Sequence, residues 1–154
     1  LRGHGLRAGP GRQLMQLTLA DLAATEALAR RLAGLLRPGD TILLEGPLGA
    51  GKSALARALL RALTNDPALE VPSPTYTLVQ AYQTPIGLVQ HFDLWRLDGA
   101  ADLAELGWDE CEAALVEWPD RLGALRPADA LSITLQPLEG DARRAVLEGW
   151  EGRL

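Results

Sequence analysis

The segment from Gly46 to Ser53 has the residue types and spacing of a loop that grips phosphate groups. It reads Gly-Pro-Leu-Gly-Ala-Gly-Lys-Ser and matches the pattern G-x-x-x-x-G-K-S/T at every fixed position. Its glycines let the backbone turn N–H groups toward an anion without a Cβ in the way. Lys52 can then reach the β- and γ-phosphates, and the Ser53 hydroxyl can ligate Mg²⁺. We therefore predict binding of a magnesium-bound nucleotide.

Two acidic residues come at the ends of apolar runs that are typical of buried strands. Asp93 ends the run over 88–92, and Glu117 ends the run over 113–116. Open α/β sheets assemble their ligand sites at the carboxyl ends of strands. One acid can hold magnesium while the other orients the water that attacks the nucleotide. Residue types alone leave open the alternative that either acid only caps a strand end in solvent.

A segment with two prolines, Val71–Thr75, cannot continue a helix. Ser73 and Thr75 are candidates for a switch that senses the γ-phosphate, although residue types alone favour a surface turn with capping hydroxyls. His91 lies two residues before Asp93, so its side chain should point to the same sheet face. We interpret His91 as a packed or supporting histidine rather than a general base.

The periodicity around these residues predicts alternating strands and helices. The pattern becomes helical from Thr18, with Asp21 as a candidate cap near its start, and ends at Pro38-Gly39; a buried strand is expected over 41–45 and a second helix over 52–63. Further strands are expected over 77–82, 88–92, 113–117, 131–135 and 145–147, with turns at 84–87 and 139–141 and a short helix over 100–106. The pattern predicts an α/β fold: a P-loop NTPase-like three-layer domain with a mostly parallel sheet and helices on both faces.

Composition excludes several classes of protein. A chain of 154 residues with 47% hydrophobic residues fits one domain with a sizeable core. A net charge of -5 argues against a broad basic surface for nucleic acid. Cys111 is the only cysteine, which excludes an intrachain disulfide and fits a reducing cytoplasm; we interpret it as a buried thiol. No apolar run approaches the roughly 20 residues that span a bilayer, so no membrane segment is expected.

The first thirteen residues differ from the rest of the chain. They hold three arginines and four glycines but no acidic residue. We expect residues 1–13 to form a disordered leader and residues 14–154 to form the single ATPase domain.

Several sequence blocks together resemble the TsaE family, bacterial ATPases of tRNA threonylcarbamoyladenosine biosynthesis. The resemblance runs from about residue 18 to residue 145 and keeps the family's order and approximate spacing. Its blocks are the loop at 46–53, Pro-Ser-Pro-Thr-Tyr-Thr-Leu-Val at 72–79 with Tyr82, His-Phe-Asp-Leu-Trp-Arg-Leu at 91–97, Glu-Leu-Gly at 105–107 and Val-Glu-Trp-Pro at 116–119.

The resemblance implies a role for each matching position. Lys52 is expected to contact phosphate, Ser73 to Thr75 to form a mobile switch, and Trp118 to belong to the nucleotide site. The expected catalytic residues are Lys52, Asp93, Glu117 and Thr75, and the expected ligands of Mg²⁺ are Ser53, Asp93 and Glu117. The expected contacts to ATP are Leu48, Gly49, Ala50, Gly51, Lys52, Ser53 and Trp118, with adenine contacts from Leu22, Thr25 and Gly140.

The resemblance also implies partners. In this family a slow ATPase works with the TsaB and TsaD proteins, and TsaD transfers the threonylcarbamoyl group to adenosine 37 of tRNA. The ATPase resets that complex, and the tRNA is held mainly by the partners. Three positions depart from the usual pattern: Pro47 replaces an aspartate, Ser53 a threonine and Trp95 a tyrosine. Ser53 keeps the hydroxyl, whereas Pro47 removes a charge and Trp95 removes a hydrogen-bonding group.

Two other functions use the same loop. A small-molecule kinase would bring an arginine-rich lid over the phosphates. Arg121, Arg126, Arg143 and Arg144 are scattered instead, and no basic lid segment stands out. A nucleotide-gated binding module with negligible turnover would need the same magnesium site, so the sequence does not separate it from a slow ATPase. A guanine-specific GTPase is disfavoured because the chain has no Asn-Lys-x-Asp motif.

Overall fold

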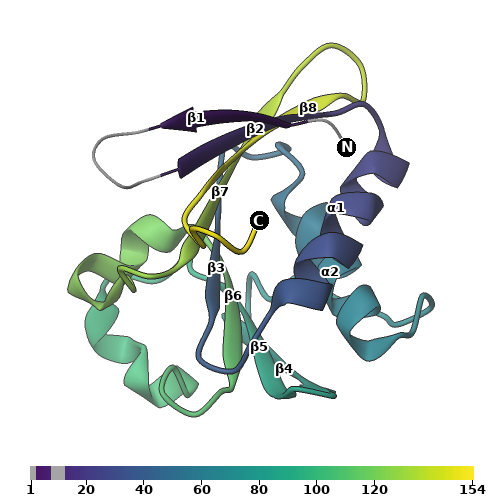
Figure 1. The fold of residues 1–154 in the computed structure, drawn as a ribbon. Helices are drawn as coiled ribbons and strands as arrows, with labels where there is room; N and C mark the ends of the chain where they lie inside the picture. Colours follow the sequence, from purple (N-terminus) through teal and green to yellow (C-terminus); the bar gives the residue numbers. More distant parts are fainter. Residues whose placement is uncertain (1–2, 8–12) are drawn as a thin grey trace.

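One mixed β-sheet runs through the part of the chain that the computed structural model describes, residues 3–7 and 13–154. Within these residues, eight strands lie in the order β1-β2-β8-β7-β3-β6-β5-β4 (Figure 1). Their bounds are β1 Gly3–Arg7, β2 Gln13–Leu19, β3 Thr41–Glu45, β4 Val79–Thr84, β5 Gly87–Asp93, β6 Ala113–Glu117, β7 Leu131–Pro137 and β8 Arg143–Glu148. The strands that the sequence predicts after residue 40 are therefore confirmed, with small shifts at their ends.

The sheet is parallel only in its centre. β3 pairs in parallel with β6 and β7, and β5 pairs in parallel with β6. On the flanks, β4 runs antiparallel to β5, β8 to β7, and β2 to β8. The prediction of a mostly parallel sheet is thus correct for the central strands and wrong for the flanks. The reason is that short turns at 85–86 and 138–142 join neighbouring strands, and short turns permit only antiparallel pairing.

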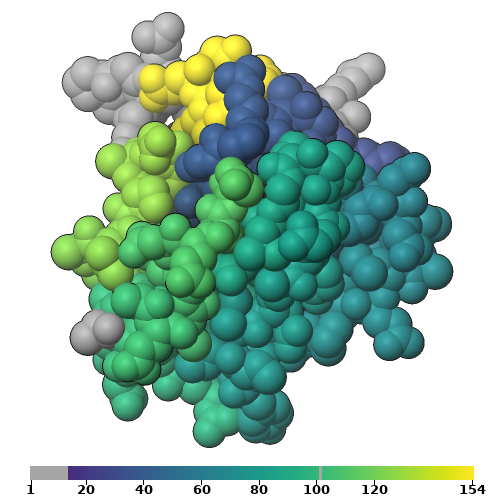
Figure 2. Space-filling view, turned by 90° about the horizontal axis from the view of Figure 1, so that it is seen from below, coloured from purple at the N-terminus to yellow at the C-terminus, as the bar shows by residue number. Residues whose placement is uncertain are grey.

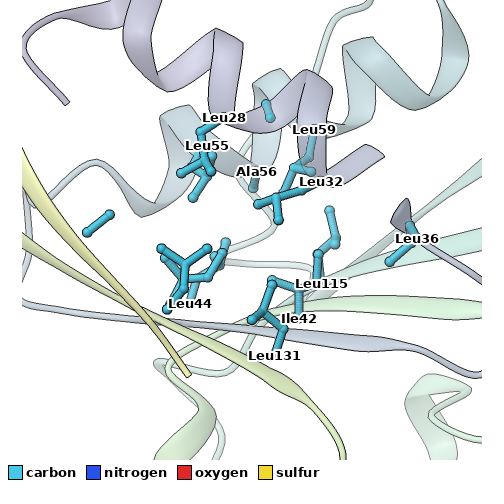
Figure 3. Close-up of a cluster of buried hydrophobic side chains, with 14 of the residues drawn as sticks. Leu28, Leu32, Leu36, Ile42, Leu44, Leu55, Ala56, Leu59, Leu115 and Leu131 are labelled. Atoms are coloured by element: carbon cyan, nitrogen blue, oxygen red, sulfur yellow. The ribbon is translucent and has the colours of Figure 1, made fainter. Parts of the chain in front are cut away.

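Two α-helices cover one face of the sheet (Figure 1). α1 (Leu22–Leu35) begins at Asp21, whose side chain accepts a hydrogen bond from the Ala24 N–H at 2.9 Å. α2 (Lys52–Thr64) begins directly after the glycine-rich loop, as predicted. Leucines of both helices point toward the sheet: Leu28 and Leu32 from α1, and Leu55 and Leu59 from α2 (Figure 3). They form the main core with the strand residues Ile42, Leu44, Leu115 and Leu131.

Short 3₁₀ helices belong to the opposite side of the sheet. They are η1 (Ala100–Asp102), η2 (Ala104–Leu106) and η3 (Pro119–Leu125). Leu103, between η1 and η2, and Leu122 of η3 belong to a second buried core, which also holds Leu43, Phe92, Leu94 and Val116. Helices therefore lie on both faces, but the α-helices among the described residues lie on one. The short helix predicted over 100–106 is two 3₁₀ turns that end at Gly107 with a φ of 82°, a left-handed conformation that stops a helix.

The start of the chain departs from the sequence-based expectation. Gly3–Arg7 forms β1 and pairs with β2, so the prediction that the first thirteen residues are disordered is wrong for this stretch. Residues 1–2 and 8–12 of the expected leader lie outside the described part. β2 adds a strand that we did not predict. Its signal is the alternation of Met15, Leu17 and Leu19, of which the two leucines are buried. Because further leucines follow in α1, we assigned residues from Thr18 onward to the helix, although β2 continues to Leu19.

The C-terminal residues return to the segment that leads into β3 (Figure 2). Arg153 donates two hydrogen bonds to the Asp40 carboxylate, at 3.0 and 2.7 Å, and one to the Leu35 carbonyl at 2.6 Å. This contact ties the chain end to the N-terminal end of β3, and the glycine-rich loop follows the other end of that strand. The longest helix among the described residues has 14 residues, and none there is long and apolar enough to cross a membrane.

Candidate functional site

The glycine-rich loop joins the central strand β3 to the start of α2. Gly46, Gly49 and Gly51 have φ values of 140°, 77° and 104°, which side chains rarely adopt. A Cβ on Gly46 would collide with the Leu135 carbonyl oxygen of β7, so only glycine fits there. Gly51 is the N-cap of α2 and carries no side chain that competes for the first N–H groups of the helix. These N–H groups form an anion site at the positive end of the helix dipole.

Lys52, the only lysine in the chain, folds back over this loop. Its Nζ donates a hydrogen bond to the Gly46 carbonyl at 2.5 Å and lies 3.2 Å from the centroid of a Trp118 ring. The side chain is 5% exposed, and burial lowers the pKa of Lys52 against the opposing pull of Glu117 and Asp93. A positive charge is thus held at the loop, within reach of an anion that enters it.

The two predicted acids lie side by side. Parallel pairing of β5 with β6 sets Asp93 opposite Glu117, and these residues are 4% and 2% exposed. Glu117 Oε1 accepts a hydrogen bond from the Ser53 hydroxyl at 2.9 Å. Both acids are therefore buried at their strand ends rather than solvated. Register brings the two carboxylates together, and the loop after β3 brings Ser53 to Glu117.

The proline-containing segment is hydrogen-bonded to Asp93. Thr75 Oγ1 donates to Asp93 Oδ2 at 3.0 Å and lies 2.8 Å from the Ser73 hydroxyl. Asp93 Oδ1 accepts from the Trp95 N–H at 3.1 Å. Each carboxylate oxygen of Asp93 therefore has a donor, and the hydroxyls of the predicted switch face the site rather than solvent alone.

His91 has a more specific position than the sequence indicated. Its Nε2 lies 2.7 Å from Glu117 Oε2, a distance that requires a hydrogen on Nε2 when Glu117 is ionised. The ring is 1% exposed, and Nδ1 forms no hydrogen bond with any described residue. Together with Ser53, His91 fixes the orientation of the Glu117 carboxylate. The spacing to Asp93 placed His91 on the correct face, but its partner on β6 has no local signal.

Trp118 closes the site from the side of Lys52. It has a φ of 59°, a left-handed conformation that is unusual for a bulky residue and marks a local constraint. Its ring lies 4.4 Å from the ring of Trp95, with an angle of 51° between the planes. Trp95 is 43% exposed, so the aromatic pair forms a rim that solvent reaches.

Two cavities flank the loop. The first, here the loop cavity, has a volume of about 280 Å³ and is lined by Leu48, Gly49, Gly51, Lys52, Ser53, Ala54, Ser73, Thr75, Asp93, Glu117 and Trp118. This lining includes every residue that we predicted to be catalytic or to bind the metal. The second, here the helix cavity, has a volume of about 190 Å³ and is lined by Leu19, Asp21, Leu22, Thr25, Ala50, Gly51, Ala54, Leu135, Asp141 and Arg143. Because Gly51 and Ala54 line both, the cavities adjoin across the first turn of α2.

The helix cavity brings together most of the residues expected to contact adenine. Leu22 and Thr25 line it, whereas Gly140 does not and its neighbour Asp141 does. Arg143 was missed as a site residue, because the sequence shows only scattered arginines. Its Nε lies 3.5 Å from the position that a Cβ on Gly51 would take, so this side chain lies against the loop.

Cys111 lies outside both cavities. It is half-buried rather than buried, and burial raises the pKa of its thiol. Its Sγ lies 3.7 Å from the Trp108 carbonyl oxygen. A raised pKa disfavours the thiolate, which is the nucleophilic form of cysteine.

Comparisons with known proteins show the family of the chain and a solved structure with a similar fold. A family model described as threonylcarbamoyl adenosine biosynthesis protein TsaE matches residues 19–146. The chain is 32% identical to the tRNA threonylcarbamoyladenosine biosynthesis protein TsaE of Rickettsia bellii, over 83% of this chain and 90% of the relative. It is 38% identical to the protein of the same name from Aquifex aeolicus, over 70% of this chain and 79% of the relative. The crystal structure of YdiB from Bacillus subtilis superposes with a TM-score of 0.72 at 22% identity, covering 94% of this chain and 91% of that one.

The position of Gly46 provides a test of the loop geometry. Gly46→Ala should lower the free energy of unfolding by about 1–3 kcal/mol, because the new Cβ meets the Leu135 carbonyl at a positive φ. Gly34→Ala in α1, where nothing lies within 4 Å, serves as the control and should be neutral or stabilise by up to about 1 kcal/mol. Urea denaturation measures both; equal stability of Gly46→Ala and the wild type would contradict the geometry.

Proposed function

The chain belongs to the TsaE family, and from this premise we propose that it binds Mg-ATP and hydrolyses it slowly to support threonylcarbamoyl modification of tRNA adenosine 37. One observation carries the proposal. Lys52, Ser53, Asp93 and Glu117 line one cavity at the N-terminus of α2. Buried acids, a hydroxyl and a lysine beside a glycine-rich loop are the parts that P-loop NTPases use for phosphoryl transfer to water.

The two adjoining cavities support a nucleotide that lies across the loop. Its phosphates would occupy the loop cavity, where the α2 N–H groups and Lys52 offer positive charge. Its nucleoside would occupy the helix cavity, against Leu22 and Thr25. The strand β3, the loop and α2 follow one another as in a P-loop NTPase fold, which we propose for this domain.

The donor atoms at the site fit a magnesium ion. Ser53, Asp93 and Glu117 present oxygen atoms only, which hard cations such as Mg²⁺ prefer. These residues would hold the ion, with phosphate oxygens and water as its other ligands. When bound, Mg²⁺ supplies charge neutralisation for the β- and γ-phosphates.

The protein side chains divide the remaining work of hydrolysis. Water attacks the γ-phosphorus, the bond from that phosphorus to the β–γ bridging oxygen breaks, and ADP and phosphate leave. Glu117, held by His91 and Ser53, is placed to orient that water. Thr75, hydrogen-bonded to Asp93, is placed to respond when the γ-phosphate is lost. Lys52 stabilises the negative charge on the phosphoryl oxygens.

Membership of the family supports a proposal about partners. Relatives that share most of this chain's length are named for tRNA threonylcarbamoyladenosine biosynthesis. We infer that the chain acts on a TsaB–TsaD pair, with TsaD as the transferase and tRNA held by that pair. The net charge of -5 agrees with a protein that does not grip tRNA by itself.

Replacement of Lys52 tests nucleotide binding. Lys52→Ala should abolish tight ATP binding in calorimetry, because it removes the charge that the loop holds for phosphate. Arg31→Ala also removes one positive charge, from the exposed surface of α1, and should leave ATP affinity unchanged. As a second measurement, ATP should protect Lys52 from an amine-reactive reagent. Unchanged ATP affinity of Lys52→Ala would refute the assignment.

Replacement of Glu117 separates an ATPase from a binding module. Glu117→Ala should reduce ATP turnover by roughly 10²–10³, because the group that orients water is lost. Glu110→Ala, which removes an exposed carboxylate, should keep wild-type turnover. If Glu117→Ala hydrolyses nothing and still supports full tRNA modification with TsaB and TsaD, hydrolysis is dispensable and the chain is a nucleotide-gated module.

A further inference from the structure

A groove with an excess of positive charge runs along the α1–α2 pair, which covers one face of the sheet (Figure 1). It has a volume of about 290 Å³, and we call it the arginine groove. Its lining residues are Leu22, Glu26 and Arg30 from α1, Ala54, Ala58, Ala62, Arg57 and Arg61 from α2, and Asn65 and Pro67 after α2. The α1 residues recur every four positions, so they share one face of that helix. The leucines that pack onto the sheet, such as Leu28 and Leu55, are not among the lining residues.

Two of the three arginines that line this groove have no partner among the residues that the structure describes. Within the described residues, Arg30 and Arg57 form no hydrogen bond, ion pair or ring contact. Arg61 uses Nε to donate to the Leu69 carbonyl at 3.0 Å, which positions its guanidinium group. Glu26 is the only acidic side chain of the groove, so the groove carries two excess positive charges on a chain whose net charge is -5. Guanidinium groups in such a setting bind carboxylates with directed hydrogen bonds.

We propose that the arginine groove docks an acidic amphipathic helix of a partner protein. The alanines of α2 and Leu22 make an apolar floor that small side chains of a helix can cover. Arg57 and Arg61 stand one helical turn apart and match carboxylates spaced four residues apart on a docked helix. Arg30 faces the same helix from the α1 wall.

Nucleic acid fits the groove less well than a protein helix does. A phosphate backbone would lie against the apolar floor and Glu26 and would gain nothing from either. RNA binding also needs cations over a wide surface, which a chain of net charge -5 does not offer. The apolar floor and the isolated arginines together favour a protein helix over nucleic acid as the ligand of the groove.

The groove adjoins the proposed nucleotide site. Leu22 and Ala54 line both the arginine groove and the helix cavity, and Leu22 is 61% exposed. A docked helix and a bound nucleoside therefore share these side chains, and each is expected to change the affinity of the other by the same factor. This coupling rests on the proposed function, as does the choice of the TsaB–TsaD pair as the source of the helix.

The experiment compares charge reversals inside and outside the groove. Binding of the purified TsaB–TsaD pair to the immobilised chain is measured by biolayer interferometry with Mg-ATP present. Arg30→Glu and Arg57→Glu should each weaken binding by about tenfold or more. Arg31→Glu makes the same charge change next to Arg30 but outside the groove, and it should alter binding by less than about twofold. Arg30→Gln, which loses the charge without reversing it, provides a milder second variant. ATP affinity of each variant alone, measured by calorimetry, should equal that of the wild type and shows that the fold is intact.

The possible outcomes separate the docking proposal from the proposed function. Equal binding by all variants overturns the docking surface and leaves the proposed ATPase standing. Failure of the pair to bind the wild type rejects both the partner assignment and the docked helix. Binding of tRNA alone that Arg30→Glu abolishes replaces the protein helix with RNA. A photo-crosslinker at Ala58 should label an acidic helical segment of the pair; a label on a segment without carboxylates would also overturn the proposal.

Discussion

Two buried carboxylates on adjacent parallel strands are the constraint on which the site depends. Asp93 and Glu117 lie opposite each other in the β5–β6 register, almost without solvent contact. Two like charges in such a place are stable only when donors and cations surround them. Ser53, His91 and Thr75 each contact one of the two carboxylates, and Lys52 adds a nearby positive charge. The cluster is thus held in place before any ligand binds, and Mg²⁺ is the ion that we propose to join it.

The fold serves this cluster by bringing four chain segments to one end of the sheet. β3 and α2 supply the loop, β5 and β6 supply the acids, and the segment before β4 supplies Thr75. β7 contributes through its backbone, because the Leu135 carbonyl lies where a side chain on Gly46 would be. The antiparallel flanks do not supply the acids or the lysine. Arg143, at the start of β8, extends one flank to the loop and borders the helix cavity.

Local sequence patterns predicted the individual segments of the site better than the contacts between them. The loop, the strand ends at Asp93 and Glu117, and α2 each have a signal within about ten residues, and the structure has all of them. The contact of Ser53 with Glu117 joins residues 64 positions apart, and it depends on the pairing of β3 with β6, which has no local signal. The partner of His91 and the approach of Arg143 to Gly51 were missed for the same reason. β2 was missed because its alternating leucines run directly into the helical pattern of α1.

The central claim is that this cluster hydrolyses ATP for a tRNA-modifying complex. The most direct measurement is magnesium-dependent ATP hydrolysis by the purified chain, alone and with a TsaB–TsaD pair. The account predicts slow hydrolysis alone, none without magnesium, and strong stimulation by the pair. Clear hydrolysis that the pair does not change would contradict the proposed partners. Absence of hydrolysis under every condition would contradict the proposed chemistry itself.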